Sequence, residues 1–342
     1  MSRTSRRVLY VGGTGTISAA CVVASLGRGD EVHVLNRGAS TLRPPPPGVH
    51  QHHADIRGDD VGQALAGLHF DAVVDFLCYT AADAQRAESI FAERTDQYIF
   101  ISSATVYRKP VARFPTTEST ALRNPLLAYA RGKLGAEQAL MVAFREREFP
   151  VTVVRPSHTY DDARPPFPGD WTVVDRILRG SEVVVSGDGT SPWTITHADD
   201  FAVGLIGLIG LTASIGEAFH ITSDEVLTWD AIHGILAAAA DVAPRLLHLS
   251  ADLIATAAPD WRWSELIRGD LSHSSIFDTT KIRSFVPAFR PQVTWEEGAR
   301  RILQWRAAHP DRSGPDPTTD SILDRLVEGY HKSLTVLRQL AP

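Results

Sequence analysis

Blocks of apolar residues recur along the first half of the chain and predict strands and helices in turn. Runs of mostly apolar residues, typical of buried strands, occupy 8–11, 31–35, 70–77, 97–102 and 151–155. Segments with the apolar spacing of one helix face lie between them, at 19–26, 81–92 and 129–143. Because strands that alternate with helices form parallel sheets, this pattern predicts an α/β fold with a doubly wound parallel sheet.

The second half of the chain is less regular. The proline-rich segment 164–170 predicts a rigid loop, and residues 311–317, which are Ser, Gly, Pro, Asp and Arg, predict a linker. Helical periodicity predicts helices at 171–178, 230–240, 295–307 and 320–340. This part of the chain is therefore expected to form a smaller, more irregular unit.

Charge and composition narrow the function classes. The 342 residues carry a formal net charge of −6 and no long basic block, so nucleic acid is not an expected partner. No stretch approaches the roughly 20 apolar residues of a membrane-spanning helix, so no membrane partner is expected either. The two cysteines, Cys21 and Cys78, lie in apolar surroundings, which fits a protein of the reducing cytoplasm rather than one with a disulfide framework.

A glycine-rich turn follows the first predicted strand. Segment 12–18 reads Gly-Gly-Thr-Gly-Thr-Ile-Ser and leads directly into a helix. Backbone N–H groups and the positive end of a helix bind pyrophosphate in this layout, and glycine lets the backbone approach closely. Gly12 and Gly15 fit the dinucleotide-binding pattern, whereas Ser18 occupies the third glycine position. The turn predicts a dinucleotide site; a structural turn without a ligand is the alternative.

The second predicted strand ends at Asn36, Arg37 and Gly38 without the acidic residue that accepts hydrogen bonds from an adenosine ribose. Arg37 instead offers a planar cation to a 2′-phosphate, which predicts a preference for NADP over NAD. A solvated loop arginine is the alternative, and Asn36 can still bond ribose hydroxyls in an NAD enzyme.

Three histidines, at 50, 52 and 53, lie close together further along the chain. No spaced carboxylate or cysteine accompanies them, so we expect them to line a third strand and expect no metal site. That strand leads to Asp55 and Ile56, which are expected to contact the adenine.

Tyr129 and Lys133 lie four positions apart and therefore one above the other on a predicted helix. A phenol titrates near ~10, and an ammonium one turn away favours the phenolate, so the pair is suited to acid/base chemistry. Such pairs are common, and a tyrosine packed on a lysine stem is the alternative. The fifth strand brings residues 102–107 to the carboxyl edge of the sheet, where a hydroxyl can reach a reacting alcohol. A Ser/Thr-rich turn that caps a helix is the alternative there.

The chain resembles the extended short-chain dehydrogenases/reductases, also called the NAD-dependent epimerase/dehydratase family, over roughly residues 7–308. The resemblance rests on an ordered set of motifs: Gly12-Gly13-Thr14-Gly15, Ser102 to Tyr107, Tyr129-x-x-x-Lys133, Val154-Arg155-Pro156, Gly187-Asp188-Gly189, Asp199-Asp200, Gly216 to Ile221, Asp278 to Arg283 and Trp295 to Gly298. It implies that Ser103 is the catalytic hydroxyl, Tyr129 the acid/base and Lys133 the residue that holds the nicotinamide ribose. It also implies cofactor contacts from Thr16, Ile17, Phe76 and Pro156.

The resemblance further implies a division of the chain. Residues 1–165 and about 194–225 are expected to form a Rossmann-like dinucleotide-binding domain. The smaller C-terminal substrate-binding lobe is expected from about 166–193 and 226–310, followed by a linker and a C-terminal helix at 311–342. Family members commonly dimerise through the helices that correspond to 81–92 and 126–145, so a homodimer is expected.

Three departures from the family pattern bear on the substrate. Ala104 and Thr105 stand where the family's dehydratases carry an acidic pair, which disfavours sugar dehydration. Trp193 stands at or beside the position of an arginine that clamps a nucleotide diphosphate, so we expect it to stack on a base or sugar of a substrate whose pyrophosphate is absent or unimportant. The alternative is that Trp193 packs in the lobe while another arginine, such as Arg262 or Arg268, binds the diphosphate. His158 adds a second titratable group beside the nicotinamide, or a histidine that only forms hydrogen bonds. Thr105, His158 and Trp193 are thus the candidate substrate contacts.

Together these observations predict an NAD(P)-dependent epimerase or oxidoreductase that transfers hydride at a secondary alcohol of a nucleoside or nucleotide sugar. An NADPH-dependent ketoreductase of a small-molecule pathway is one alternative. A non-catalytic dinucleotide-sensing or RNA-binding protein on the same fold is another.

Overall fold

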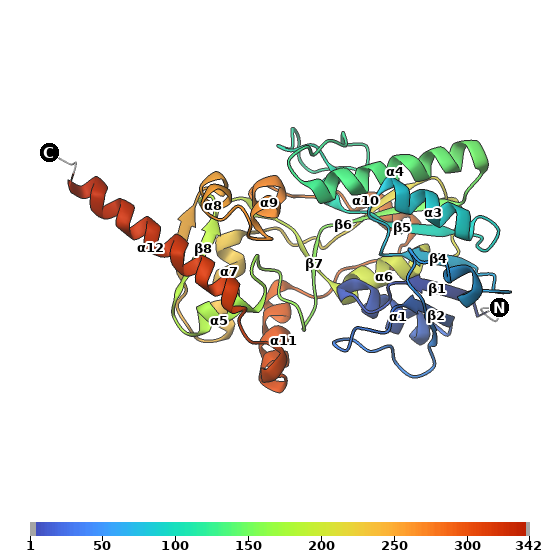
Figure 1. Cartoon of the computed structure of the whole chain (residues 1–342), viewed down its shortest axis with the longest axis horizontal. Helices are drawn as coiled ribbons and strands as arrows, with labels where there is room; N and C mark the ends of the chain where they lie inside the picture. Colours follow the sequence, from blue (N-terminus) through green and yellow to red (C-terminus); the bar gives the residue numbers. More distant parts are fainter. Residues whose placement is uncertain (1–4, 340–342) are drawn as a thin grey trace.

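The computed structural model describes residues 5–339, and its centre is a seven-stranded parallel sheet (Figure 1). Its strands run in the order β11-β6-β5-β4-β1-β2-β3. Their bounds in that order are Ala218–Ile221, Val151–Pro156, Tyr98–Ile101, Ala72–Asp75, Arg7–Val11, Glu31–Asn36 and His50–His53. The strand order reverses between β1 and β4, so a crevice for a ligand is expected at the carboxyl ends of these strands.

Helices cover both faces of this sheet, as the alternation of elements predicts (Figure 1). The covering helices are α1 (Thr16–Arg28) and α6 (Ala198–Leu208) on one face, and α3 (Ala81–Phe91) and α4 (Ala128–Arg147) on the other. Successive side chains of a strand point to opposite faces. Val8 and Tyr10 of β1 accordingly pack into the core under α1 and α6, and Leu9 and Val11 into the core under α3 and α4. The predicted Rossmann-like doubly wound sheet is confirmed.

Two element boundaries differ from the sequence prediction for identifiable reasons. Helix α1 begins at Thr16 rather than residue 19, because Gly15 is already its N-cap. Strand β4 ends at Asp75 rather than at residue 77. The Asp75 carboxylate accepts hydrogen bonds from the backbone N–H groups of Leu77 (2.7 Å) and Cys78 (3.0 Å), which turns the chain out of the sheet.

The second half of the chain adds a lobe whose core is rich in tryptophan (Figure 1). Its helices are α5 (Trp171–Leu178), α7 (Trp229–Ala239), α8 (Ala251–Ala257), α9 (Ser264–Leu266) and α11 (Trp295–Ala308). Three two-stranded sheets, which the sequence pattern did not predict, pair β7 (His158–Tyr160) with β10 (Ile195–His197), β8 (Glu182–Ser186) with β13 (Arg245–Leu249), and β9 (Pro192–Trp193) with β12 (Leu227–Thr228). The chain also contains the short helices α2 (Val61–Ala64) and α10 (Thr280–Phe285).

The last helix, α12 (Pro317–Gln339), packs on the lobe at its start and projects away from the body at its far end (Figure 1). Ile322, Leu323 and Leu326 are buried, and Arg176 bonds the carboxylate of Asp320 at 2.5 Å. The predicted amphipathic helix is therefore present, although Leu340 lies outside the described residues. Between residues 5 and 339, no helix has both the length and the apolar character that crossing a bilayer requires.

Candidate active site

A pocket of about 590 Å³ lies at the carboxyl ends of the central strands and extends to the lobe. It brings together residues that the sequence analysis took from distant motifs. The predicted residues that line it are Gly12, Gly15, Thr16, Ile17, Phe76, Ser103, Thr105, Tyr129, Lys133, Pro156, His158 and Trp193. Asn36, Arg37, Asp55 and Ile56 do not line it. They belong to the ends of β2 and the segment after β3, at the edge of the sheet.

The glycine turn is held in shape by Ser18. Its hydroxyl donates to the carbonyl of Gly12 (2.7 Å) and accepts from the N–H of Gly15 (2.8 Å). Gly12 has a φ of +86°, and a Cβ there would lie 2.7 Å from Cγ of Leu77, so only glycine fits. Ser18 therefore ties together the turn at the start of α1, a role that a third glycine could not fill.

Arg37 is 73% exposed at the end of β2, and its guanidinium lies 3.9 Å from the carboxylate of Asp55. Asn36 uses its side-chain oxygen to accept from the N–H of Gly38 (2.8 Å), so that oxygen is occupied by the local turn. The exposed cation fits a phosphate ligand, while Asp55 partly offsets its charge.

Lys133 is buried beneath the pocket floor and is 2% exposed. Its ammonium donates to the carbonyl oxygens of Cys78 (2.6 Å) and Ile101 (2.8 Å). Burial lowers the pKa of Lys133 to about 8. Because an ammonium has three N–H donors, one remains for a ligand hydroxyl beyond these two contacts.

Tyr129 lines the pocket from the first turn of α4, and the residue is 42% exposed. The protein around the phenol raises its pKa, Tyr79 adds to this rise, and a hydrogen bond with Ser103 opposes it. The Lys133 ammonium lies 5.8 Å from the ring centre and is bound to its two carbonyls. The prediction that Lys133 lowers the pKa of Tyr129 is therefore wrong for this structure.

Ser103 lies at the end of β5 and caps the short 3₁₀ helix Ala104–Val106. Its hydroxyl accepts from the N–H (3.2 Å) and the hydroxyl (3.0 Å) of Thr105. With these two donors directed at its oxygen, the Ser103 proton is free to be donated toward Tyr129 or a ligand oxygen. The helix-capping alternative is thus realised, and it is compatible with a chemical role.

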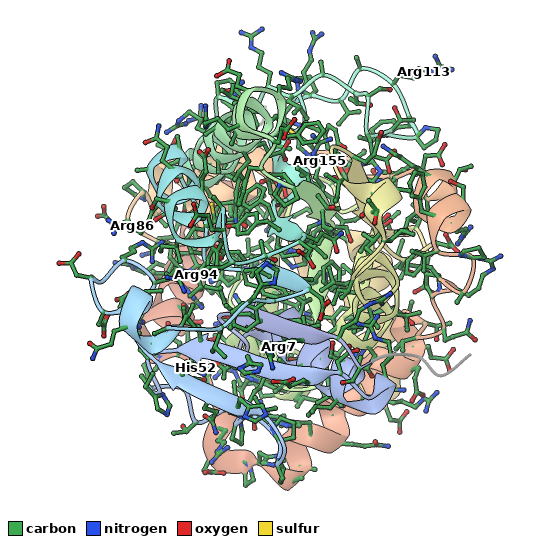
Figure 2. The ribbon with its side chains drawn as sticks, turned by 90° about the vertical axis from the view of Figure 1, so that its right-hand side faces the viewer. Arg7, His52, Arg86, Arg94, Arg113 and Arg155 are labelled. Atoms are coloured by element: carbon green, nitrogen blue, oxygen red, sulfur yellow. The ribbon has the colours of Figure 1, made fainter. Side chains whose placement is uncertain are left out.

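A buried polar network lies behind this site, and sequence reasoning missed it. Glu137 of α4 accepts from Ser102 (2.5 Å) and from two nitrogens of Arg155 in β6 (2.6 and 3.0 Å). Arg155, labelled in Figure 2, also donates to the Tyr107 hydroxyl at 2.9 Å, and Tyr107 contacts His220 at 2.5 Å. One signal was available: Glu137 follows Lys133 by four residues and therefore lies on the same buried face of the helix.

His158 lines the lobe side of the pocket, with its ring edge toward Trp193 (centroids 6.5 Å apart) and Trp229 (6.4 Å). Its Nε2 lies 3.2 Å from the carbonyl oxygen of Pro166. A carbonyl only accepts, so Nε2 carries the proton and Nδ1 is an acceptor. Burial lowers the pKa of His158, which keeps the ring neutral. These contacts favour a hydrogen-bonding His158 over a second acid/base.

Trp193 contacts the pocket but is only 2% exposed. Its ring packs against Trp229 with centroids 5.5 Å apart, and the Lys109 ammonium lies 5.8 Å from its centre. No open ring face is available to a base or sugar, so the expectation of a stacking platform is not met. The surrounding tryptophans of the lobe core explain the difference, because they bury the indole.

Two arginines lie on the lobe side of the pocket: Arg262, which is the alternative candidate for binding a diphosphate, and Arg164, which was not expected there. Arg164 and Arg262 both line it, and both pair with the carboxylate of Asp170, at 3.4 and 2.6 Å. They are 50% and 63% exposed. Exposed ion pairs of this kind contribute little to stability, so the two cations are available to an anionic ligand.

Comparison with known proteins agrees with this geometry. Residues 8–221 match the NAD dependent epimerase/dehydratase family. The chloroplast stem-loop binding protein of 41 kDa b from Arabidopsis thaliana is 25% identical over 244 residues, which are 67% of this chain and 62% of that protein. The chain thus spans less than two thirds of the length of this curated relative.

Solved structures share the fold. An epimerase from Methanothermobacter thermautotrophicus aligns with a TM-score of 0.72 at 17% identity, over 90% of this chain and 94% of the other. UDP-glucuronic acid 4-epimerase from Bacillus cereus, in complex with UDP-glucuronic acid and NAD, also gives 0.72 at 17% identity, over 88% and 99%. At such identities, the likeness establishes the architecture.

Proposed function

Because the chain belongs to the NAD dependent epimerase/dehydratase family, we propose that it is an NAD(P)-dependent epimerase or oxidoreductase. It acts by hydride transfer on a secondary alcohol of a sugar moiety. The observation that carries this proposal is the meeting of Ser103, Tyr129 and Lys133 with the glycine turn around one pocket. These residues come from the segment after β5, from α4 and from the β1–α1 turn, and their convergence is what such chemistry requires.

The chain's own residues divide the work as follows. Tyr129 exchanges a proton with the substrate oxygen, and its raised pKa keeps the phenol ready to donate to a carbonyl. Ser103 holds that oxygen through its free hydroxyl proton, and Lys133 offers its third N–H to a ribose hydroxyl. The dinucleotide, when bound by the glycine turn, supplies the hydride acceptor or donor.

The substrate we propose is a nucleotide sugar, with Arg164 and Arg262 in contact with its phosphates. This revises the expectation based on Trp193, since the two arginines offer the charge that an indole lacks. The Bacillus cereus structure was solved with a UDP-sugar, which supports the same substrate class.

A turnover comparison of UDP-, GDP- and dTDP-sugars with nucleosides that lack phosphate tests this proposal. We expect a nucleotide sugar to be preferred and Arg262→Ala to raise its KM about tenfold or more, the scale of a lost charge-assisted bond. Arg268→Ala is the matched control, because Arg268 pairs with Asp252 at 2.8 Å and does not line the pocket. Efficient turnover of a phosphate-free nucleoside would contradict it.

We propose NADP(H) as the preferred cofactor, based on the exposed Arg37. Arg37→Ala should lower NADP affinity about tenfold, because a charge-assisted contact is worth roughly 1.5–3 kcal/mol, and should leave NAD affinity unchanged. Titrating both dinucleotides into both proteins measures this. Equal NADP affinity in the two proteins would mean that Arg37 does not contact the cofactor. Arg37 would then be a solvated loop residue whose main contact is Asp55.

A non-catalytic nucleic-acid-binding role is the second candidate, and the stem-loop binding relative favours it. The net charge of −6 and the presence of all three catalytic residues oppose it. Absence of turnover across the sugar panel, together with RNA binding that weakens as salt rises, would favour this role. An NADPH-dependent ketoreductase uses the same residues and is distinguished by net reduction without isomerisation.

We also propose a homodimer and a cytoplasmic location. A homodimer through α3 and α4 would use the two helices that pack side by side on one face of the sheet (Figure 1). Cys21 and Cys78 are free and buried, which suits the reducing cytoplasm.

A further inference from the structure

Histidines gather at the outer edge of the sheet, away from the proposed active site. His33 of β2 is paired in register with His50 of β3, and their rings stack with centroids 4.6 Å apart. The ring of His52 is nearly parallel to that of His33, with centroids 5.2 Å apart. Figure 2 shows His52 on the outermost strand of the sheet. Glu31 of β2 adds a carboxylate, which the spacing of the three later histidines could not reveal.

Hydrogen bonds fix the proton positions in this cluster. Nδ1 of His52 lies 3.1 Å from the carbonyl oxygen of Ala64, which can only accept, so this nitrogen carries a proton. In the neutral ring Nε2 of His52 is then an acceptor, and Nδ1 of His33, 2.9 Å away, donates to it. Nε2 of a neutral His33 is left with a lone pair.

That lone pair points at another acceptor. Nε2 of His33 lies 3.0 Å from Oε1 of Glu31. Two acceptors at this distance repel unless a cation lies between or beside them. Arg7 donates to the same Oε1 at 2.8 Å and so satisfies the carboxylate, yet it gives nothing to His33.

We propose that Glu31, His33 and His50 bind a divalent transition-metal ion, with Zn²⁺ as the best-fitting one. One ligand atom from each residue can be chosen so that all three lie within 4.8 Å of one another. Ligands around tetrahedral zinc lie roughly 3.3 Å apart, so the ligand atoms must approach one another, and the His50 ring, which is stacked on His33, must turn to aim a nitrogen at the ion. His50 is exposed on an edge strand and can make that movement. Neutral imidazole with one carboxylate is a donor set that zinc accepts.

The arrangement around these ligands supports a metal. His52, held by Ala64, fixes the tautomer of His33, which is how residues beyond the ligands orient a metal-binding histidine. A bound ion would join β3 to β2 at the start of the edge strand. Since residues 37–49 connect these strands, the ion would also close the loop that begins at Arg37.

Isothermal titration of Zn²⁺ into the untagged, chelator-treated full chain tests the site. We expect one ion per chain with micromolar affinity, reduced at least tenfold in His50→Ala and in Glu31→Gln. His53→Ala is the matched control and should bind as the unchanged protein does, since position 53 alternates to the other side of β3. Zn²⁺ should also raise the thermal unfolding midpoint of the unchanged protein and of His53→Ala, with no rise in His50→Ala.

Two results would overturn the proposal. One is equal zinc affinity in His50→Ala and the unchanged protein, which would place any bound ion at another of the 13 histidines. The other is no binding by the unchanged protein at millimolar Zn²⁺, in which case a proton on His33 satisfies Glu31. His50 is exposed, so His50→Ala is expected to fold, and its melting curve without zinc checks this.

Discussion

Tyr129→Phe is expected to lower turnover by about 10²-fold or more, while the fold and the dinucleotide affinity stay unchanged. The substitution removes only the phenolic hydroxyl, which is the group that the proposed mechanism uses to exchange a proton with a substrate oxygen beside Ser103. In the proposed mechanism, the dinucleotide is bound by the glycine turn and Lys133, which the substitution leaves in place. Steady-state kinetics together with fluorescence titration of the cofactor separate the two effects.

Tyr79→Phe provides a matched control for this experiment. Tyr79 also lines the pocket, and its ring centre is 6.2 Å from that of Tyr129, so the same atom is deleted in the same surroundings. Its turnover should stay within about threefold of the unchanged protein, because no proton transfer is assigned to it. Near-normal activity of Tyr129→Phe would remove that residue from the mechanism, and an equal loss in both variants would indicate a packing effect.

The sequence predicted the scaffold and the meeting of Ser103, Tyr129 and Lys133 because both follow from short-range patterns. Alternating apolar blocks determine which segments are strands, and the glycine turn marks where the first strand meets its helix. Residues at the ends of parallel strands meet at one edge of the sheet. The sequence alone therefore predicts that Ser103 lies close to the Gly12 turn. The four-residue spacing of Tyr129 and Lys133 places both on one helix face in the same way.

What the sequence could not supply depends on contacts between distant segments. The Lys133 ammonium is held beneath the pocket floor by hydrogen bonds to the carbonyl oxygens of Cys78 and Ile101. A sequence motif does not reveal either of these backbone contacts. The sequence predicts an accessible Trp193 ring because Trp229, which packs against it, lies 36 positions further along the chain. The carboxylate missing from the histidine cluster was likewise on the adjacent strand, as Glu31. In each case, strand pairing or packing in the lobe places a group from a distant segment beside the residue that the sequence pattern identified.

Arg155→Met is expected to lower the free energy of unfolding by about 3–5 kcal/mol, the range for breaking a buried ion pair. The side chains of Arg155 and Glu137 are 6% and 4% exposed, so the substitution leaves an uncompensated carboxylate inside the protein. It also removes the donor to Tyr107, whose side chain is fully buried against His220. Urea unfolding followed by circular dichroism, with the slope compared between proteins, measures the change.

Arg147→Met tests whether this loss comes from burial rather than from removing an arginine. Arg147 pairs with Glu88, but its side chain is 49% exposed, so the loss should stay within about 1 kcal/mol. The double variant Arg155→Met, Glu137→Gln should lose clearly less than the sum of its two single variants, because the second change removes the stranded charge. A loss below about 1 kcal/mol for Arg155→Met alone would mean that water reaches Glu137 and solvates it. The network behind Ser102 would then contribute little to holding β5 and α4 together.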